Sequence, residues 1–408
     1  MKKKVNIVCN LNCSRRQMDV AKMEYYLRLN DFDITENQEK ADYIIVSTCG
    51  FINETTKAAL NEIEKAKKTS ASVIVTGCVP DTDTEKLKSI YEGVIIHNTE
   101  LEKFDEYFGT FYKWNDIPIV HNMSWGKEYF CAEVSRGCPE NCSYCATKWA
   151  VGKLRSKTLA ECIAEIETFN QSPQNKVVIN GDNVGAYGLD IGETFGTFIK
   201  TIPLPDNKYT ALIDSFHPRW MLKYESEVLD TVHKNRLGMI VSAFQAGSER
   251  ILKLMRRPVS MVKLKVLYKT LKLSSPNMVL GTEVIVGFPT ETEDEFQESI
   301  KFVLETQIDW GHIFAFSPKE GTDAAAMEGQ IEESVKYDRI KRFIKQLEKY
   351  GYVVHMEEKS HAVIFCRNEI CIGAEENVNS YWQHCFDTIC PDRNQQLEFR
   401  KEYIEKFS

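Results

Sequence analysis

The first part of the chain alternates between short apolar runs and segments in which apolar residues recur every three or four positions. These runs and helix-period segments lie at residues 5–8, 18–29, 43–47, 54–68 and 72–76. Strands that alternate with helices favour a parallel sheet. We therefore predict a small parallel α/β domain over residues 1–112.

Three cysteines follow the three predicted strands of this domain. Cys13, Cys49 and Cys78 come after the first, second and third apolar run, respectively. Because the carboxyl ends of parallel strands converge on one edge of a sheet, we expect these thiols to meet in space. A single cysteine is more often a small buried hydrophobe, but three at successive strand ends indicate a cluster-sized site.

The pattern of strand followed by helix continues from residue 128 to about residue 327. The strands predicted here cover residues 128–134, 176–179, 209–213, 239–243, 281–286 and 311–316. Five or six such units suit a partial, open (β/α) barrel with its chemistry at the carboxyl ends of the strands. We predict that barrel over residues 113–330, then a helical connection over 331–358 and a short β-rich C-terminal domain over 359–408.

Length and composition narrow the class of protein. At 408 residues, the chain is long enough for two or three domains. It contains no apolar run of the ~18 residues that a membrane span needs and no signal-peptide pattern at its start. We therefore expect a cytoplasmic protein without a membrane partner, and a monomer. The net charge of −8 gives no general support for nucleic-acid binding.

Thirteen cysteines in such a chain argue for metal or redox chemistry rather than disulfides. Cys138, Cys142 and Cys145 have C-x3-C-x2-C spacing, with Tyr144 before the last. Three thiolates can hold three irons of a [4Fe–4S] cluster and leave the fourth iron for S-adenosylmethionine (SAM). The spacing matches the radical SAM signature. A zinc knuckle is the alternative, but zinc sites favour paired C-x2-C units.

An ordered series of motifs resembles the radical SAM methylthiotransferases over residues 5–327. Besides Cys13 with Asp19, where Asn12 replaces the usual glycine, the matching segments are STCGFI (47–52), VTGCVP (75–80), RGCPENCSYC (136–145), NGDNVGAYGLD (180–190), SFHPRW (215–220), QAGS (245–248), LMRRP (254–258), EVIVGFPTET (283–292) and FSPKEGT (316–322). Members of this family insert a methylthio group at a C–H carbon of tRNA adenosine or of a ribosomal-protein aspartate.

The resemblance implies two [4Fe–4S] clusters and two uses of SAM. Cys13, Cys49 and Cys78 would hold the cluster that carries the inserted sulfur, and one SAM would supply its methyl group. A second SAM, bound at the cluster of the C-x3-C-x2-C loop, would give the 5′-deoxyadenosyl radical. The candidates for SAM binding lie beside the last cysteine of the loop or at the barrel strands, and they are Tyr144, Gly181, Asp182, Gln245, Glu283 and Gly287. The alternative is that these are turn glycines and ordinary polar residues of strands. An electron donor such as flavodoxin or ferredoxin is a further expected partner.

Other residues keep two interpretations. Tyr187 and His217 are candidates for substrate contact, although a lone histidine is more often structural. Arg256 and Arg257 either form a solvated pair at a helix end or hold an anion such as the carboxylate of SAM. Cys9, Cys131 and Cys162 have the character of structural residues.

The C-terminal tail departs from the family pattern. Most members end in an RNA-binding-type β-barrel called TRAM, whereas residues 359–408 are short and divergent, with six basic and eight acidic residues. Because affinity for a polyanion comes chiefly from Lys and Arg, this favours a protein or peptide substrate over tRNA. The pairs Cys366/Cys371 and Cys385/Cys390 are a weaker metal-binding pattern with atypical spacing.

Two further readings of the chain stay open. One is a radical SAM enzyme that uses the N-terminal cluster only for electron transfer. The other is an iron–sulfur carrier or regulator that binds SAM without turnover. The motifs that follow the cysteine loop argue against a carrier, because a carrier needs no pocket for directing a radical.

Overall fold

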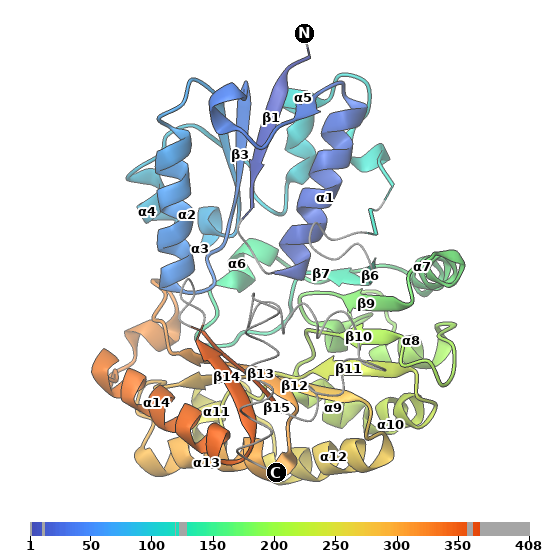
Figure 1. Ribbon diagram of the computed structural model, residues 1–408, viewed down its shortest axis with the longest axis vertical. Coiled ribbons are helices and arrows are strands. Elements are labelled where there is room, and N and C mark those ends of the chain that lie inside the picture. The colour runs from blue at the N-terminus through green and yellow to red at the C-terminus, as the bar shows by residue number, and fades with distance from the viewer. Residues whose placement is uncertain (1, 10–12, 119, 122–128, 357–361, 368–408) are drawn as a thin grey trace, which may run out of the picture. The chain divides into compact units, whose positions relative to one another are not determined.

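A computed structural model describes residues 2–9, 13–118, 120–121, 129–356 and 362–367 (Figure 1). The chain divides into two compact units. The first comprises Met1–Ser172, Val177–Thr194 and Ser317–Ala326, and the second comprises Pro173–Lys176, Phe195–Phe316 and Met327–Ser408.

Unit 1 begins with a five-stranded sheet whose strand order is β2-β1-β3-β4-β5. The strands are β1 (Lys4–Val8), β2 (Asp33–Ile34), β3 (Tyr43–Thr48), β4 (Ser72–Gly77) and β5 (Val94–Ile95), and every pairing between them is parallel. This order is that of a doubly wound sheet, in which the direction of winding reverses between β1 and β3. Ligands bind in such sheets at the carboxyl ends of the strands beside that reversal.

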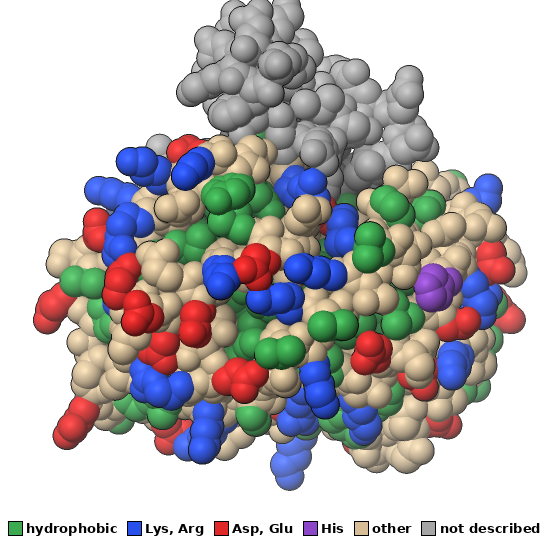
Figure 2. Space-filling view, turned by 90° about the horizontal axis from the view of Figure 1, so that it is seen from below, with side chains coloured by type: hydrophobic (Ala, Val, Ile, Leu, Met, Phe, Trp, Pro, Cys, Tyr) green, Lys and Arg blue, Asp and Glu red, His purple; other side chains and the backbone are tan. Residues whose placement is uncertain are grey.

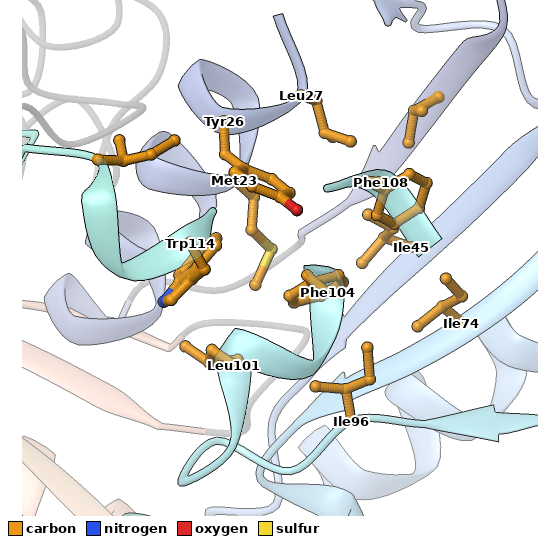
Figure 3. Packing of buried hydrophobic residues seen from close by; sticks show 12 residues of the cluster. Met23, Tyr26, Leu27, Ile45, Ile74, Ile96, Leu101, Phe104, Phe108 and Trp114 are labelled. Carbon is orange, nitrogen blue, oxygen red and sulfur yellow. The ribbon is translucent and has the colours of Figure 1, made fainter. Parts of the chain in front are cut away.

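Both faces of this sheet are covered by other parts of the domain. Because successive side chains of a strand point to opposite faces, one strand contributes to the core on each side. Ile45 of β3 packs with Met23, Tyr26, Phe104 and Trp114 on one face (Figure 3). Ile44 and Val46 of the same strand pack with Ala59 and Ile63 on the other. The helices of the domain are α1 (Ser14–Leu29), α2 (Asn53–Ala66), α3 (Val79–Thr82), α4 (Thr84–Lys88) and α5 (Asp105–Phe108).

The rest of unit 1 carries the C-x3-C-x2-C loop. Its elements are β6 (Tyr129–Glu133), β7 (Ser135–Arg136), α6 (Thr147–Val151), β8 (Arg155–Ser156), α7 (Leu159–Gln171) and β9 (Lys176–Asn180). Strand β6 lies next to β9, and β7 pairs antiparallel with β8. The loop runs from β7 to α6, so its two ends are held by secondary structure.

Unit 2 contains a mixed sheet with the strand order β14-β15-β13-β12-β11-β10. Its parallel strands β10 (Ala211–Ile213), β11 (Leu237–Val241), β12 (Val279–Val286) and β13 (Trp310–Ala315) are joined to the antiparallel strands β15 (Val363–Arg367) and β14 (Tyr352–Met356). Its helices are α8 (Phe195–Thr201), α9 (Pro218–Lys223), α10 (Glu225–His233), α11 (Glu249–Leu254), α12 (Met261–Ser274), α13 (Glu293–Thr306) and α14 (Glu333–Lys349).

The α/β fold class predicted from the sequence is confirmed, with a parallel N-terminal sheet followed by a run of β/α units. Strand β15 contains the apolar run 363–366 and falls within the C-terminal domain predicted over residues 359–408. In the structure this run pairs with β13 and β14 and completes the sheet of unit 2. The remaining tail, with Cys371, Cys385 and Cys390, lies outside the described residues.

In the part of the chain that the structure describes, no helix is both long and apolar enough to cross a membrane.

Candidate functional site

Each of the three N-terminal cysteines lies between a parallel strand and the helix that follows it. Cys13 is the residue before α1, Cys49 comes directly after β3, and Cys78 lies between β4 and α3. The side chain of Cys13 is exposed, that of Cys49 is half-buried and that of Cys78 is buried. In sequence, Cys13 and Cys49 follow β1 and β3, the two strands between which the winding of the sheet reverses.

Two glycines let the loops that carry Cys49 and Cys78 approach each other. A Cβ on Gly77 would lie 2.3 Å from the backbone N and O of Thr48, and its φ of +95° is one that glycine adopts without strain. A Cβ on Gly50 would lie 1.8 Å from Oγ1 of Thr82. Both glycines are therefore required for the close packing of these two strand ends.

The three N-terminal thiols influence one another electrostatically. Burial raises the pKa of the Cys78 thiol to about 12; Arg16 opposes this rise, and the nearby Cys49 and Cys13 add to it. The Cys78 sulfur also accepts a hydrogen bond from Nδ2 of Asn98 at 3.7 Å. At neutral pH the metal-free site therefore holds a protonated Cys78 thiol, which must lose its proton when it binds iron.

The C-x3-C-x2-C loop is held through the residues just before its first cysteine. Gly137 has a φ of +82°, and a Cβ there would lie 2.0 Å from the carbonyl oxygen of Lys153. Cys138 N donates to the carbonyl oxygen of Gly152 at 3.2 Å. Burial raises the pKa of the Cys138 thiol to about 12, and the neighbouring Cys145 and Cys142 contribute to the rise, so this trio is also gathered in space.

The segment after β9 supports this loop from the other side. Asp182 Oδ2 accepts a hydrogen bond from Gly137 N at 2.6 Å. Asn183 Nδ2 donates to the sulfur of Cys138 at 3.8 Å and to Oε1 of Glu140 at 3.3 Å. Gly181 is packed so closely that a Cβ there would lie 2.9 Å from Oγ of Ser135. The sequence analysis assigned Gly181 and Asp182 to SAM, and in the structure the Asp182 carboxylate holds the backbone before Cys138.

In unit 2, Gln245 and Glu283 lie side by side. Gln245 N donates to the carbonyl oxygen of Glu283 at 3.0 Å, and its φ of +69° is unusual for a residue other than glycine. Burial raises the pKa of the Glu283 carboxyl; Arg257 opposes this rise, and Asp214 adds to it. Gly287 also has a positive φ, of +78°, and a Cβ there would lie 2.4 Å from Cγ of Lys336.

The structure gives the environments of the arginine pair, the histidine and the tyrosine that had two interpretations in the sequence. Arg256 is exposed, whereas Arg257 is buried and donates to the carbonyl oxygen of Ala243 at 2.7 Å. Burial, reinforced by Arg257 and Arg219, lowers the pKa of His217 to about 2, so its imidazole is neutral. Tyr187 is 0% exposed, and its hydroxyl accepts a hydrogen bond from Cys162 at 3.7 Å, which is the environment of a core residue.

The residues of both thiol trios fit the chemistry of an iron–sulfur cluster. Each supplies three thiols, and Cys78 and Cys138 each accept an N–H hydrogen bond of the kind that tunes cluster potentials. Within the described residues, no three His, Cys, Asp or Glu side chains are arranged to hold one metal ion. A cubane needs no such group, because its protein ligands bind separate irons.

The polar pair in unit 2 has a feature that fits an organic cofactor. The side-chain oxygen of Gln245 is buried and has no hydrogen-bond partner within the described residues. A buried acceptor of this kind is stabilised by a donor from a bound molecule. The hydroxyl and ammonium groups of SAM are such donors.

Unit 1 also contains a group of charged residues, mostly buried, that was not predicted from the sequence. Arg136 Nη2 lies 2.8 Å from Asp19 Oδ1, and Arg136 Nε lies 2.7 Å from Glu133 Oε1. Arg15 lies 3.5 Å from Glu133 and 3.7 Å from Asp182. The available signal was the start of α1, where Arg15 and Arg16 occupy a first turn that contains no acidic residue. Cations are unfavourable at that end of a helix unless they have another role.

Glu133 gives this group a measurable pH dependence. Burial raises the pKa of its carboxyl, but Arg15 and Arg136 outweigh that effect and hold the pKa at about 2. Because the folded-state pKa lies below the ordinary value of 4.5, Glu133 stabilises the fold above about pH 4.5, and this contribution is lost as the pH falls toward 2.

We predict that Glu133→Gln lowers the free energy of unfolding at pH 7 by about 3 kcal/mol. The difference between wild type and variant should narrow as the pH falls from about 5 to 3, as measured by urea unfolding of the metal-free protein. Glu100→Gln, which breaks an exposed pair with Lys103, serves as the control and should have little effect. A Glu133→Gln effect that does not change with pH would contradict this account.

The chain is similar in sequence to known families and proteins. Residues 5–97 match the family described as "Uncharacterized protein family UPF0004", and residues 132–303 match the radical SAM superfamily. The chain is 28% identical over 379 residues to the ribosomal protein uS12 methylthiotransferase RimO of Chlamydia felis, covering 88% of this chain and 81% of that protein. It is 27% identical over 383 residues to the tRNA-2-methylthio-N(6)-dimethylallyladenosine synthase of Fusobacterium nucleatum, covering 88% and 87%.

Solved structures share the fold. The radical SAM methyltransferase TsrM of Kitasatospora setae aligns with a TM-score of 0.55 at 11% identity, over 80% of this chain and 77% of that chain. The cobalamin-dependent SAM radical enzyme OxsB aligns with a TM-score of 0.53 at 12% identity, over 85% of this chain and 56% of that chain.

The fold and the two matched regions define a radical SAM protein. More narrowly, the chain belongs to the radical SAM methylthiotransferase family, and it is an enzyme of the sulfur-inserting transferase class.

Proposed function

We propose that this enzyme inserts a methylthio group at an unactivated C–H carbon of a protein or peptide side chain. It would use one SAM as methyl donor and a second as the source of the radical. Methylthiolation of a modified adenosine in tRNA is the alternative substrate, and use of the N-terminal cluster for electron transfer alone is the alternative mechanism.

The observation that carries the proposal is the presence of two separate thiol trios within one compact unit. A radical SAM enzyme that only abstracts hydrogen needs one of them. The second trio, at the carboxyl ends of parallel strands, supports a site that carries a reactant of its own. Soft thiolate ligation suits a site that holds sulfur.

Each thiol trio would bind one cofactor. Cys138, Cys142 and Cys145 would bind one [4Fe–4S] cluster, and Cys13, Cys49 and Cys78 would bind the other. When bound, the first would supply the electron that cleaves SAM and the second would hold the sulfur to be inserted. Tyr144, Gly181, Asp182, Gln245, Glu283 and Gly287 would bind SAM.

Two of these assignments have physical support in unit 2. The buried Gln245 side-chain oxygen can accept a hydrogen bond from SAM, and Glu283 beside it can accept another. Burial raises the pKa of the Glu283 carboxyl, and the nearby Arg257 opposes this rise. Because the pKa of His217 is lowered to about 2, its imidazole stays neutral at neutral pH, and we assign it no role in proton transfer.

The preference for a protein or peptide substrate rests on charge. The relatives divide between a ribosomal protein and tRNA, so they do not choose between these substrates. The tail from residue 359 carries more acidic than basic residues. Figure 2 shows one face of the molecule, on which Lys and Arg side chains are interspersed with Asp and Glu. The described residues on that face form no continuous basic surface of the kind that favours binding to a polyanion.

The destination of the methylthio group can be measured in cells. Cells with and without the gene would be grown on methyl-labelled methionine, and their tRNA nucleosides and digested proteins would be compared by mass spectrometry. We expect a gene-dependent methylthio product in the protein or peptide fraction. A product confined to tRNA would overturn the substrate preference, and no product in either fraction would favour the electron-transfer alternative.

A further inference from the structure

A buried side chain connects the segment that follows Cys13 to the segment that precedes Cys138. Arg15, two residues after Cys13, donates from Nη1 to the carbonyl oxygen of Ser135 at 2.9 Å. Its Nη2 lies 3.7 Å from Oδ2 of Asp182, and this same oxygen accepts the hydrogen bond from Gly137 N at 2.6 Å. One arginine and one carboxylate therefore span the space between the two thiol trios within unit 1.

A second connection runs beside the first. Arg136, two residues before Cys138, lies 2.8 Å from Asp19 of α1, and Arg16 of the same helix lies 3.0 Å from Asp19. The side chain of Asp19 is 2% exposed and that of Arg16 is 5% exposed. Glu133, 2.7 Å from Arg136 and 3.5 Å from Arg15, joins the two connections.

The charges in this group balance, with three arginines against Asp19, Glu133 and Asp182. As a whole, a group of buried ion pairs adds little net stability, since the cost of removing the charges from water offsets their attraction. Removal of a single charge, as in Glu133→Gln, is costly because it leaves a buried partner unpaired. The relative positions of the ionic side chains are tightly constrained, in contrast, because each charge must lie next to its partner. Such a group therefore fixes an arrangement more effectively than it stabilises the fold, and here the fixed parts are helix α1 and the C-x3-C-x2-C loop.

The loop has little freedom to absorb a displacement. Gly137 is held by Asp182 on its backbone N–H, and the carbonyl oxygen of Lys153 occupies the space where a Cβ would lie. Cys138 follows directly and is anchored to Gly152. A shift of the Arg15 side chain is therefore passed to Cys138 through Asp182 and Gly137, rather than being lost in a flexible segment.

We propose that Arg15 and Asp182 are positioning residues that hold the N-terminal thiol trio and the C-x3-C-x2-C trio at a fixed separation. The inference rests on the proposed function, because a sulfur-carrying site and a radical-generating site must serve the same substrate carbon. It gives the Asp182 carboxylate a role in aligning the two sites. A misplacement of about 1 Å between reacting groups lowers a rate by roughly 100-fold.

The test compares Arg15→Leu with Arg15→Lys and with a matched control. The control is Lys272→Met in unit 2, which removes the cation 2.6 Å from the buried carboxylate of Asp309 at the amino ends of β12 and β13. It breaks an ion pair of similar burial at the end of the barrel that sets stability rather than chemistry.

The first readout uses metal-free protein and needs no activity. Hydrogen exchange of the peptide that contains Gly137 should become at least about tenfold faster in Arg15→Leu, because the carboxylate that holds this amide loses its partner. Arg15→Lys should restore part of the protection, and Lys272→Met should leave this peptide unchanged. Equal exchange in Arg15→Leu and wild type would overturn the inference.

The second readout uses reconstituted protein. The amount of methylthio product per 5′-deoxyadenosine should fall by about 10- to 100-fold in Arg15→Leu and remain unchanged in Lys272→Met. A ratio that is unchanged in Arg15→Leu would overturn the inference. If wild type cleaves SAM without giving a methylthio product, the proposed function fails. The positioning role of Arg15 is then tested by the magnetic coupling between the two reduced clusters, which depends on the distance between them. Unaltered coupling in Arg15→Leu would reject that role.

Discussion

Replacement of Cys142 by alanine is expected to abolish cleavage of SAM to 5′-deoxyadenosine. Cys142 is the middle thiol of the C-x3-C-x2-C loop and is only 6% exposed, so solvent has little access to take its place. Without it two thiols remain, and a cluster held by two ligands is labile. We expect the rate to fall by roughly three orders of magnitude or more, and iron to fall from about eight to about four atoms per chain.

The matched control for this experiment is Cys162→Ala. Cys162 lies in the same unit, is 1% exposed, donates to the hydroxyl of Tyr187 and belongs to neither thiol trio. Its replacement should cost some stability and leave the iron content and the formation of 5′-deoxyadenosine close to those of wild type. Full activity of Cys142→Ala, measured with dithionite as reductant, would contradict the assignment of the loop.

Replacement of Cys49 by alanine is expected to separate the two halves of the reaction. Cys49 follows β3 at the sheet edge and is half-buried beside Cys13 and Cys78. Its loss removes a ligand of the N-terminal trio and leaves the C-x3-C-x2-C loop intact. SAM cleavage should therefore stay within a fewfold of wild type, whereas the methylthio product should fall by roughly 1000-fold.

Cys9→Ala provides the comparison for Cys49. Cys9 is a half-buried thiol that follows β1, and its sulfur accepts a weak hydrogen bond from Gln17 at 3.9 Å. The sequence analysis treats it as structural, and Cys9→Ala should form product at close to the wild-type rate. If Cys49→Ala still formed the methylthio product, the sulfur would have to come from elsewhere, and the role of the N-terminal trio would be wrong.

The fold could be predicted wherever burial is strong on both faces of a strand. The runs 43–47 and 72–76 predicted β3 and β4 to within a residue, because parallel strands covered on both sides are continuously apolar. The two-residue strands β2 and β5 and the short helices α3 and α4 were not predicted. Elements of that length have no periodicity of their own and form only because neighbouring segments hold them in place.

The cysteines of the candidate site could be predicted from the sequence, but the side chains that support them could not. The spacing of Cys138, Cys142 and Cys145 and the positions of Cys13, Cys49 and Cys78 after strands can be read directly from the sequence. The supporting network cannot, because Arg15 and Ser135 are 120 residues apart in the chain and nothing local to either predicts the other. Asn98 and Asn183, which donate to Cys78 and Cys138, were missed for the same reason.

The most direct test of the account is to follow the methyl group of SAM in the purified, reconstituted enzyme. Protein would be incubated with methyl-labelled SAM, freed of small molecules and acidified, and volatile methanethiol would be collected. We predict labelled methanethiol from wild type and from Cys142→Ala, and none from Cys49→Ala, because the proposed role of the N-terminal trio is to hold the sulfur that accepts the methyl group. Wild-type protein that forms 5′-deoxyadenosine but releases no labelled methanethiol would contradict the proposed methylthiotransferase mechanism and favour electron transfer.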